Sequence, residues 1–145
     1  MRDEPLVSTF MTAKVQTLSP DDRLLEAALL MRSSHFRHIP IVEDGQLVGI
    51  LTDRDIQRCT PSLLARVSPE EYNAIFEETE ISRVMTREPL KISPGAPLVE
   101  AVALLREKKL GCLPVVENGK LVGIITKADM LSALLRILET AQVTR

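Results

Sequence analysis

A threonine followed three residues later by an aspartate occurs twice in the chain, in two nearly identical segments. Residues 49–55 read Gly-Ile-Leu-Thr-Asp-Arg-Asp, and residues 123–129 read Gly-Ile-Ile-Thr-Lys-Ala-Asp. Each segment ends a short apolar run and begins a polar one, which predicts a strand that leads into a helix. The first turn of a helix leaves backbone N–H groups free for an anion, and a carboxylate accepts hydrogen bonds from hydroxyl groups. A ligand with both phosphate and a diol, such as a ribonucleotide, would use both properties.

The two segments belong to a longer internal repeat with a constant offset of 74 residues. The residues that recur at this offset include Met11-Thr12 and Met85-Thr86, Ser19-Pro20 and Ser93-Pro94, and Pro40 and Pro114. An ungapped repeat of this length indicates a duplicated supersecondary unit, whose copies bury their apolar faces against one another. We therefore predict an α/β (α+β) fold with a first repeat at residues 1–60, a helical connector at 61–80, and a second repeat with a C-terminal helix at 81–145.

Each repeat is predicted to contain the elements β-α-β-β-α. The short apolar segments 15–18 and 90–92 are candidates for the first strand. Ser19-Pro20 and Ser93-Pro94 then look like helix starts, with serine at the cap and proline at the first helical position. The amphipathic spacing of the residues that follow predicts that both helices bury one face.

Two tight hairpins and two further helices complete the prediction. Asp44-Gly45 and Asn118-Gly119 are strong signals for a two-residue hairpin between apolar strands. In the connector, Ser68-Pro69 begins a short helix with acidic residues in its first turn. After the second Thr-x-x-Asp segment, an apolar helix should run to about Thr140.

The composition excludes several classes of protein. A formal net charge of −2, with neither a Lys/Arg block nor interleaved aromatics, argues against a nucleic-acid partner. We expect neither a secretory signal nor a membrane span, because the N-terminus is polar and no apolar run approaches roughly 20 residues. Cys59 and Cys112 lack metal-ligand spacing, which is typical of a reduced cytoplasmic protein. The two histidines form no catalytic or metal-binding pattern, so we do not expect an enzyme.

Taken together, these motifs resemble a tandem pair of CBS domains. The resemblance depends on Met-Thr at the start of each repeat, an apolar strand with a central proline, an Asp-Gly or Asn-Gly turn, and a Gly-Ile-x-Thr-x-x-Asp ending. It covers nearly the whole chain, and the segment between the repeats is similar to that of bacterial stand-alone pairs of the acetoin-utilisation type. The resemblance implies two pseudo-twofold-related units that pack sheet to sheet as one CBS pair.

The resemblance also implies a regulatory sensor that binds AMP, ADP, ATP or S-adenosylmethionine in clefts between the repeats, without an obligatory cofactor. The family's aspartates would hold ribose hydroxyls, its threonines would face ribose or phosphate, and the neighbouring cations would lie near phosphate. The matching residues are Thr52, Arg54 and Asp55 in the first repeat, and Thr126, Lys127 and Asp129 in the second. Adenine would rest against strand residues, for which the candidates are Val15, Ile39, Pro40, Leu90, Leu113 and Pro114.

The repeats differ where phosphate would bind. Family members often carry His or Arg, pointing toward phosphate, at the position of His38, whereas the second repeat has Cys112 there. Ala128 likewise stands where the first repeat has Arg54, and Arg37 adds a positive charge beside His38. We therefore predict two ligand sites of unequal phosphate demand.

Each candidate residue also has a purely structural interpretation. The threonines could be helix caps, and the aspartates could be first-turn acids that interact favourably with the helix dipole. The apolar segment 130–138 either packs on the core or forms a homodimer contact. A second function therefore stays open, namely a structural or protein-interaction adaptor that dimerises through its CBS units without ligand. For a sensor, the sequence does not identify the regulated partner protein.

Overall fold

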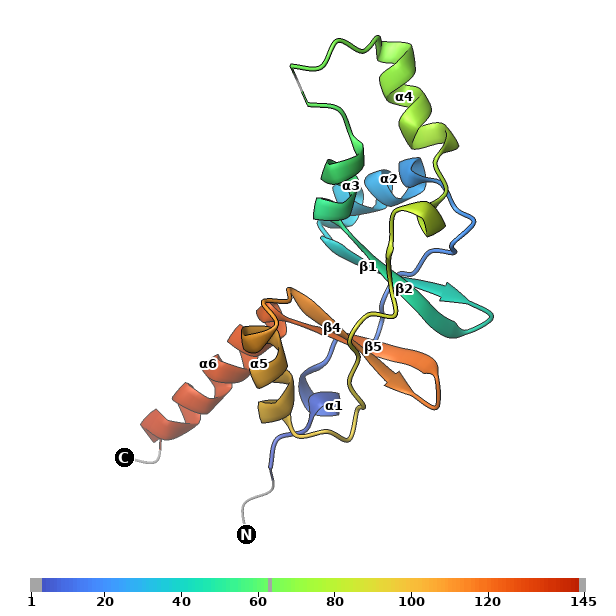
Figure 1. The fold of residues 1–145 in the computed structure, drawn as a ribbon. Helices are drawn as coiled ribbons and strands as arrows, with labels where there is room; N and C mark the ends of the chain where they lie inside the picture. Colours follow the sequence, from blue (N-terminus) through green and yellow to red (C-terminus); the bar gives the residue numbers. More distant parts are fainter. Residues whose placement is uncertain (1–3, 63, 144–145) are drawn as a thin grey trace. The chain divides into compact units, whose positions relative to one another are not determined.

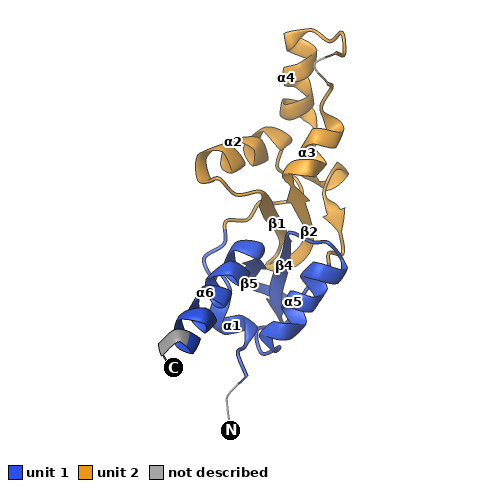
Figure 2. Cartoon of the chain, turned by 90° about the vertical axis from the view of Figure 1, so that its left-hand side faces the viewer, with its two compact units in different colours: residues 1–15, 90–145 blue, residues 16–89 orange. Residues whose placement is uncertain are grey.

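The computed structural model describes residues 4–62 and 64–143, which form two compact units (Figure 2). Unit 1 consists of Met1–Val15 and Leu90–Arg145, and unit 2 is Gln16–Pro89. The helices and longer strands, labelled in Figure 1, are α1 (Val7–Phe10), α2 (Leu24–Ser34), β1 (His38–Glu43), β2 (Gln46–Thr52), α3 (Asp53–Cys59), α4 (Pro69–Glu78), α5 (Leu98–Glu107), β4 (Cys112–Glu117), β5 (Lys120–Thr126) and α6 (Lys127–Val143). Between α4 and α5 lie the 3₁₀ turn η1 (Ile81–Arg83) and the short strand β3 (Thr86–Arg87).

An antiparallel hairpin forms the centre of unit 2. β1 pairs with β2 in a register that places His38 opposite Thr52, and β3 pairs with β2 in turn. At the turn, Asp44 and Gly45 have φ values of 51° and 80°. Two successive positive φ angles are typical of the two-residue type I′ turn, so the hairpin prediction is confirmed. The buried core beneath the hairpin consists of Leu24, Ala27, Ile39, Ile41, Leu51, Ile81 and Met85.

Unit 1 repeats this arrangement. β4 pairs with β5 so that Cys112 lies opposite Thr126, and the turn residues Asn118 and Gly119 have φ values of 53° and 80°. Both hairpins also have a register shift at the same position, between the fourth and fifth residues of the first strand. The buried core of this unit consists of Val7, Ile92, Leu98, Ala101, Leu105, Leu113, Val115, Ile125 and Ala133.

A strap of eight residues closes each unit, residues 5–12 in unit 1 and residues 79–86 in unit 2. Three backbone hydrogen bonds recur at the offset of 74. They are Leu98 N to Pro5 O (2.7 Å), Val7 N to Ala96 O (2.9 Å) and Ser8 N to Pro94 O (2.9 Å) in unit 1, and Leu24 N to Thr79 O (3.0 Å), Ile81 N to Asp22 O (2.8 Å) and Ser82 N to Pro20 O (3.0 Å) in unit 2. Each strap lies in sequence before one repeat but packs on the hairpin of the other. The duplicated segments are therefore exchanged between the units.

The methionine of each strap packs against the glycine that begins the Gly-Ile-x-Thr-x-x-Asp motif of the hairpin. A Cβ atom at Gly49 would lie 2.6 Å from Met85 Sδ and 2.9 Å from the carbonyl oxygen of the next residue. A Cβ atom at Gly123 would lie 2.8 Å from Met11 Sδ and again 2.9 Å from the following carbonyl oxygen. Only glycine allows this close approach. The Met-Thr and Gly-Ile motifs therefore recur together because they pack on one another.

Ser19-Pro20 does not begin a helix, so this prediction is wrong. Asp22 closes a single turn on Ser19, donating its N–H to Ser19 O (3.1 Å) and accepting the Ser19 N–H through Oδ2 (2.8 Å). The backbone is then extended at Arg23, and α2 begins at Leu24. Arg23 is extended because it forms a β-bridge with the strap of unit 2, and a residue in that conformation cannot continue a helix.

The predicted helix start at Ser93-Pro94 is wrong for the same reason. α5 begins at Leu98, after an extended Pro97 that faces the strap of unit 1 through a β-bridge. The predicted first strands at 15–18 and 90–92 are each reduced to one parallel bridge to the hairpin. Pairing with distant segments therefore overrides the local signals at the start of both repeats.

The remaining elements agree with the prediction. α4 lies in the connector with Ser68 as its N-cap, whose side chain accepts the Glu71 N–H at 3.1 Å. α6 reaches Val143, slightly beyond the expected end at Thr140. Hairpins and helices within each unit confirm the α+β fold class. Within residues 4–62 and 64–143, none of the helices is long and apolar enough to cross a bilayer.

Candidate functional site

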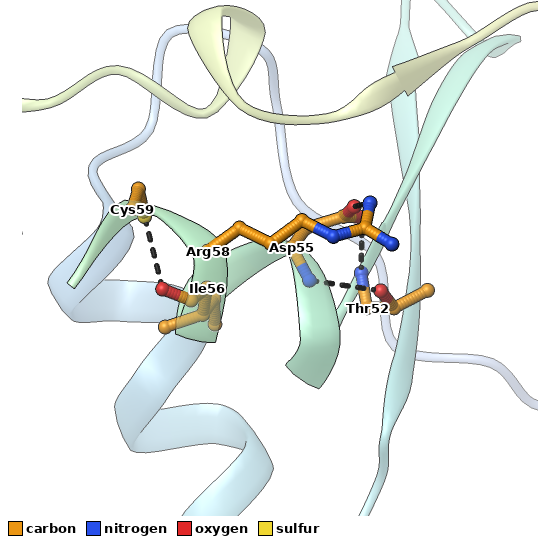
Figure 3. A network of polar contacts seen from close by, with 5 residues as sticks. All are labelled: Thr52, Asp55, Ile56, Arg58 and Cys59. Atoms are coloured by element: carbon orange, nitrogen blue, oxygen red, sulfur yellow. Dashed lines mark hydrogen bonds and ion pairs between the residues drawn. The ribbon is translucent and has the colours of Figure 1, made fainter. Parts of the chain in front are cut away.

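The first junction, where β2 leads into α3, is held by a reciprocal pair of hydrogen bonds (Figure 3). Thr52 Oγ1 accepts the Asp55 N–H at 3.1 Å, and Asp55 Oδ2 accepts the Thr52 N–H at 2.9 Å. This is a capping box, an arrangement that contributes about 1 kcal/mol to helix stability. The structural interpretation of these two residues is thus confirmed. The cap leaves the second carboxylate oxygen, Oδ1, for another partner.

Three arginines supply positive charge to this junction. Arg58 Nη1 lies 3.8 Å from Asp55 Oδ1, and Figure 3 shows its side chain reaching back along α3 toward the carboxylate. Arg37 Nη1 lies 3.4 Å from Asp53 Oδ2, and Arg54 is exposed. The Asp55 side chain is only 8% exposed, whereas that of Arg58 is 78% exposed. The carboxylate is therefore fixed in the protein, while the guanidinium group is free to change partners.

The second junction, where β5 leads into α6, has the same threonine and carboxylate with a different third partner. Asp129 Oδ2 accepts the N–H and the hydroxyl group of Thr126, at 2.8 and 3.1 Å. Asp129 Oδ1 accepts the hydroxyl group of Thr12 at 3.1 Å. Thr12 belongs to the strap of unit 1 and is itself held by backbone hydrogen bonds to Ile124 at 2.8 and 2.9 Å. This carboxylate is therefore connected to the strap.

The backbone amides at both helix starts are largely occupied. Asp53 N donates to Arg37 O (3.1 Å) and Lys127 N donates to Gly111 O (3.3 Å), while the amides of Asp55 and Asp129 donate to their capping threonines. The prediction that first-turn N–H groups are free for an anion is wrong for these four amides. A phosphate would instead depend mainly on the cationic side chains.

The residues at the start of the two hairpins differ in burial and in chemistry. His38, the first residue of β1, is half-buried, whereas Cys112, the first residue of β4, is 7% exposed. Burial raises the pKa of the Cys112 thiol to about 12. Burial also raises the pKa of the Cys59 thiol, which donates to Ile56 O at 3.0 Å (Figure 3). Neither thiol is activated as a nucleophile, because reactive cysteines need a lowered pKa.

The strand residues predicted to contact adenine are mostly part of the units' interiors. Ile39 of β1 and Leu113 of β4 are fully buried within the cores of units 2 and 1. The carbonyl groups of Pro40 and Pro114 accept the amides of Leu18 (3.3 Å) and Ile92 (3.0 Å). The two remaining candidates lie in unit 1, where Val15 is half-buried and Leu90 is 48% exposed.

Two site residues, Arg58 and Thr12, were missed by sequence reasoning, although each has a signal. Arg58 follows Asp55 by three residues, a spacing that places both side chains on one face of a helix. Thr12 belongs to the repeated Met-Thr motif but lies 117 residues from Asp129. Residues 4–62 and 64–143 contain no group of three or more His, Cys, Asp or Glu side chains that could hold a metal ion.

A hollow in unit 2 lies apart from these candidates. It has a volume of about 990 Å³ and an apolar floor of leucines between segment 16–18 and α2. Its lining residues are Gln16, Thr17, Leu18, Glu26, Leu29, Leu30, Arg32 and Ser33. None of them is a predicted site residue, so the hollow does not bear on the two junctions.

Similarity to known proteins agrees with the duplicated fold. The family model of the CBS domain matches residues 7–60 and 81–136. This chain belongs to the CBS-domain family. The predicted tandem CBS pair is thereby confirmed, and both junctions lie within the matched residues.

Three solved CBS structures are similar to this chain. The protein from Vibrio cholerae described as the acetoin utilization protein AcuB is 30% identical, with a TM-score of 0.82 over 99% of both chains. CBSX2 from Arabidopsis thaliana, solved in complex with AMP, is 28% identical, with a TM-score of 0.77 over 92% of this chain and 98% of that chain. The CBS domain pair of MJ0100, in complex with 5′-methylthioadenosine and S-adenosylmethionine, is 25% identical, with a TM-score of 0.74 over 91% of this chain and 97% of that chain. The first similarity confirms the resemblance to the acetoin-utilisation type.

Proposed function

We propose that this CBS pair is a regulatory module that binds an adenosine-containing ligand at its two junctions and transmits the bound state to a partner protein. AMP, ADP, ATP and S-adenosylmethionine are the candidate ligands, each as a regulatory ligand and none as an obligatory cofactor. The observation that carries the proposal is the duplicated arrangement of one threonine and one carboxylate at two helix starts. The AMP complex of CBSX2 and the S-adenosylmethionine complex of MJ0100 support the ligand class.

In this proposal the two aspartates bind ribose through the oxygen that does not cap the helix. Oδ2 of Asp55 and of Asp129 stays with the backbone of its threonine, which fixes the carboxylate in place. Oδ1 of each carboxylate then accepts a ribose hydroxyl group, because the groups it meets in the free protein are replaceable side chains. The ligand's phosphate would be neutralised by nearby cations. The candidates are Arg37, His38, Arg54 and Lys127.

Calorimetric titration with AMP, ADP, ATP and S-adenosylmethionine tests the proposal. We expect at least one of the four to bind the wild-type protein. Asp55→Asn and Asp129→Asn keep an oxygen for the helix cap but remove the charge, so each should weaken binding at its own junction by about 1–3 kcal/mol. Asp44→Asn is the matched control, because asparagine already stands at the equivalent position 118. A folded protein that binds none of the four ligands would overturn the sensor proposal.

A homodimer that acts as a protein-interaction adaptor is the second candidate function, and a stripe of exposed leucines on α6 supports it. Ala133 is buried against the core of unit 1, so α6 does pack on this unit. The stripe faces away from that core at the spacing i, i+3, i+4, i+7, and each residue is at least half exposed. It consists of Leu131, Leu134, Leu135 and Leu138. Burying such a stripe in a second copy would remove apolar surface from water at about 25 cal/mol per Å².

Light scattering distinguishes the homodimer from the monomer. The double variant Leu131→Lys, Leu135→Lys should be monomeric, because two charges would be buried in the proposed contact. Leu64→Lys is the control, since Leu64 is 93% exposed and lies outside the stripe. This variant should be a dimer, as the wild-type protein is expected to be. A monomeric wild-type protein would remove the dimer proposal.

For either function we place the protein in the cytoplasm, where its free thiols Cys59 and Cys112 would stay reduced.

A further inference from the structure

The two junction carboxylates differ in the group that holds their Oδ1 oxygen. Asp55 Oδ1 faces the guanidinium group of Arg58 at 3.8 Å. Asp129 Oδ1 accepts the neutral hydroxyl group of Thr12 at 3.1 Å. The second repeat has Ser132 at the position of Arg58, and this serine donates to a backbone carbonyl of its own helix at 3.2 Å. One carboxylate therefore carries a charged partner that a ligand would have to move, and the other does not.

We propose that Arg58 makes the first junction selective for adenosine ligands with an anionic tail, and that the second junction lacks this selectivity. This inference rests on the proposed function, because it concerns the same carboxylates. When a ribose hydroxyl group takes Asp55 Oδ1, Arg58 loses its partner, and a ligand phosphate supplies a new one.

The difference in burial between the two partners makes this exchange favourable for a nucleotide. Asp55 is held by the cap and is 8% exposed, whereas Arg58 is 78% exposed and can rotate into solvent toward a phosphate. Guanidinium groups bind phosphate through charge-assisted and often bidentate hydrogen bonds. Uncharged adenosine offers no such replacement, and it leaves Arg58 one helical turn (i, i+4) from the like charge of exposed Arg54. Arg58 should therefore raise the affinity of the first junction for AMP and should not raise its affinity for adenosine.

The second junction tolerates both kinds of ligand. The Thr12 hydroxyl group can donate and accept, so it can remain beside a ribose hydroxyl group without loss of a charged partner. Glycine, alanine and serine stand at positions 111, 128 and 132, which correspond to the three arginines of the first junction. Only Lys127 adds a positive charge within the second Thr-x-x-Asp segment. The preference for AMP over adenosine should accordingly be weaker here.

Calorimetry with AMP and adenosine on variants that isolate one junction tests the proposal. In the Asp129→Asn background, which retains the first junction, Arg58→Ser copies the second repeat. It should weaken AMP binding threefold to tenfold, the range expected for one exposed charge–phosphate contact, and leave adenosine binding equal or tighter. In the Asp55→Asn background the same substitution should not change the ratio of the two affinities. Arg66→Ser is the control, because it removes one exposed positive charge elsewhere in unit 2.

The outcomes separate this inference from the proposed function. Arg58 does not determine selectivity if Arg58→Ser weakens the binding of AMP and of adenosine equally, or if Arg66→Ser weakens AMP binding as much as Arg58→Ser does. The sensor proposal stands in both cases. If the wild-type protein binds neither AMP nor adenosine, the inference about Arg58 fails, whereas the sensor proposal fails only if ADP, ATP and S-adenosylmethionine do not bind either. Arg58→Gln provides a second variant that keeps the length of the side chain. Its melting temperature and that of Arg58→Ser should match the wild type within a few degrees, because the side chain is largely exposed.

Discussion

The two units share their backbone contacts and differ in the charge of their junctions. The straps, the hairpin turns, the register shifts and the capping pairs recur at the same offset. By contrast, the first junction has Arg37, Arg54 and Arg58, where the second has Gly111, Ala128 and Ser132. The comparison indicates that the two units share the backbone contacts that hold the fold together, although many of the residues that make these contacts differ. The positions that would face a ligand's phosphate diverged.

We expect the largest effect from two separate variants, Gly49→Ala and Gly123→Ala, which test the architecture that the units share. In both variants the new methyl group would meet the backbone carbonyl of the strap at 2.9 Å, and a strap held by backbone hydrogen bonds cannot easily move. We expect each to destabilise the protein by about 2–4 kcal/mol in urea unfolding. Gly95→Ala is the control, since nothing lies within 4 Å of its Cβ position. A cost below about 0.5 kcal/mol in one variant but not in the other would mean that the two straps are not packed alike.

The second test concerns position 112, where the second repeat has a buried thiol and the first repeat has the half-buried His38. Burial raises the pKa of the Cys112 thiol from 9.0 to about 12, so the folded protein binds this proton more tightly than the unfolded chain. The resulting stabilisation is complete below pH 9 and is lost as the pH rises from 9 toward 12. Between pH 8 and 10.5, the wild type should lose about 2 kcal/mol more stability than Cys112→Ala. Parallel pH profiles of the two proteins, measured by urea unfolding, would contradict this.

The fold was predictable where its signals are local. Asp44-Gly45 and Asn118-Gly119 predicted both hairpins because the turn itself requires positive φ angles. Ser19-Pro20 predicted a helix that begins only at Leu24, because Arg23 is drawn into a bridge with a strap that lies 57 residues further along the chain. No pattern within a window of a few residues contains that information.

The candidate site was predictable to the same extent. The motif identified Thr52 and Asp55, and it correctly offered a helix cap as their structural role. It could not show that Asp55 and Asp129 differ at Oδ1, because one partner comes from the same helix and the other from the opposite end of the chain. The expected free amides were wrong because a capping box and the chain before β1 occupy them.

A third prediction separates the two straps at their threonines. Thr12 donates its hydroxyl group to Asp129 Oδ1, whereas the equivalent Thr86 makes no side-chain hydrogen bond within residues 4–62 and 64–143. Thr12→Val should therefore cost about 1 kcal/mol of stability, the usual net value for one hydrogen bond, because the exposure of this bond to solvent offsets the gain from the charged acceptor. Thr86→Val, its matched control, should stay within about 0.5 kcal/mol of the wild type in urea unfolding. Equal costs would show that the second carboxylate is not held by its strap.

The smallest expected effect concerns an ion pair present in one unit only. Arg23 Nη1 lies 3.2 Å from Glu80 Oε1, which joins the start of α2 to the strap of unit 2, whereas unit 1 has Pro97 and Leu6 at these positions. Both charged side chains are 43% exposed, so solvent screens their attraction.

A double-mutant cycle of Arg23→Ala and Glu80→Ala should give a coupling free energy of about 0.5 kcal/mol at low salt, and less at 1 M salt. Arg66→Ala combined with Glu80→Ala serves as an unpaired control. A coupling above about 1.5 kcal/mol that persists at high salt would mean that unit 2 depends on charge to hold its strap. In that case the two units would differ in how they are stabilised as well as at their junctions.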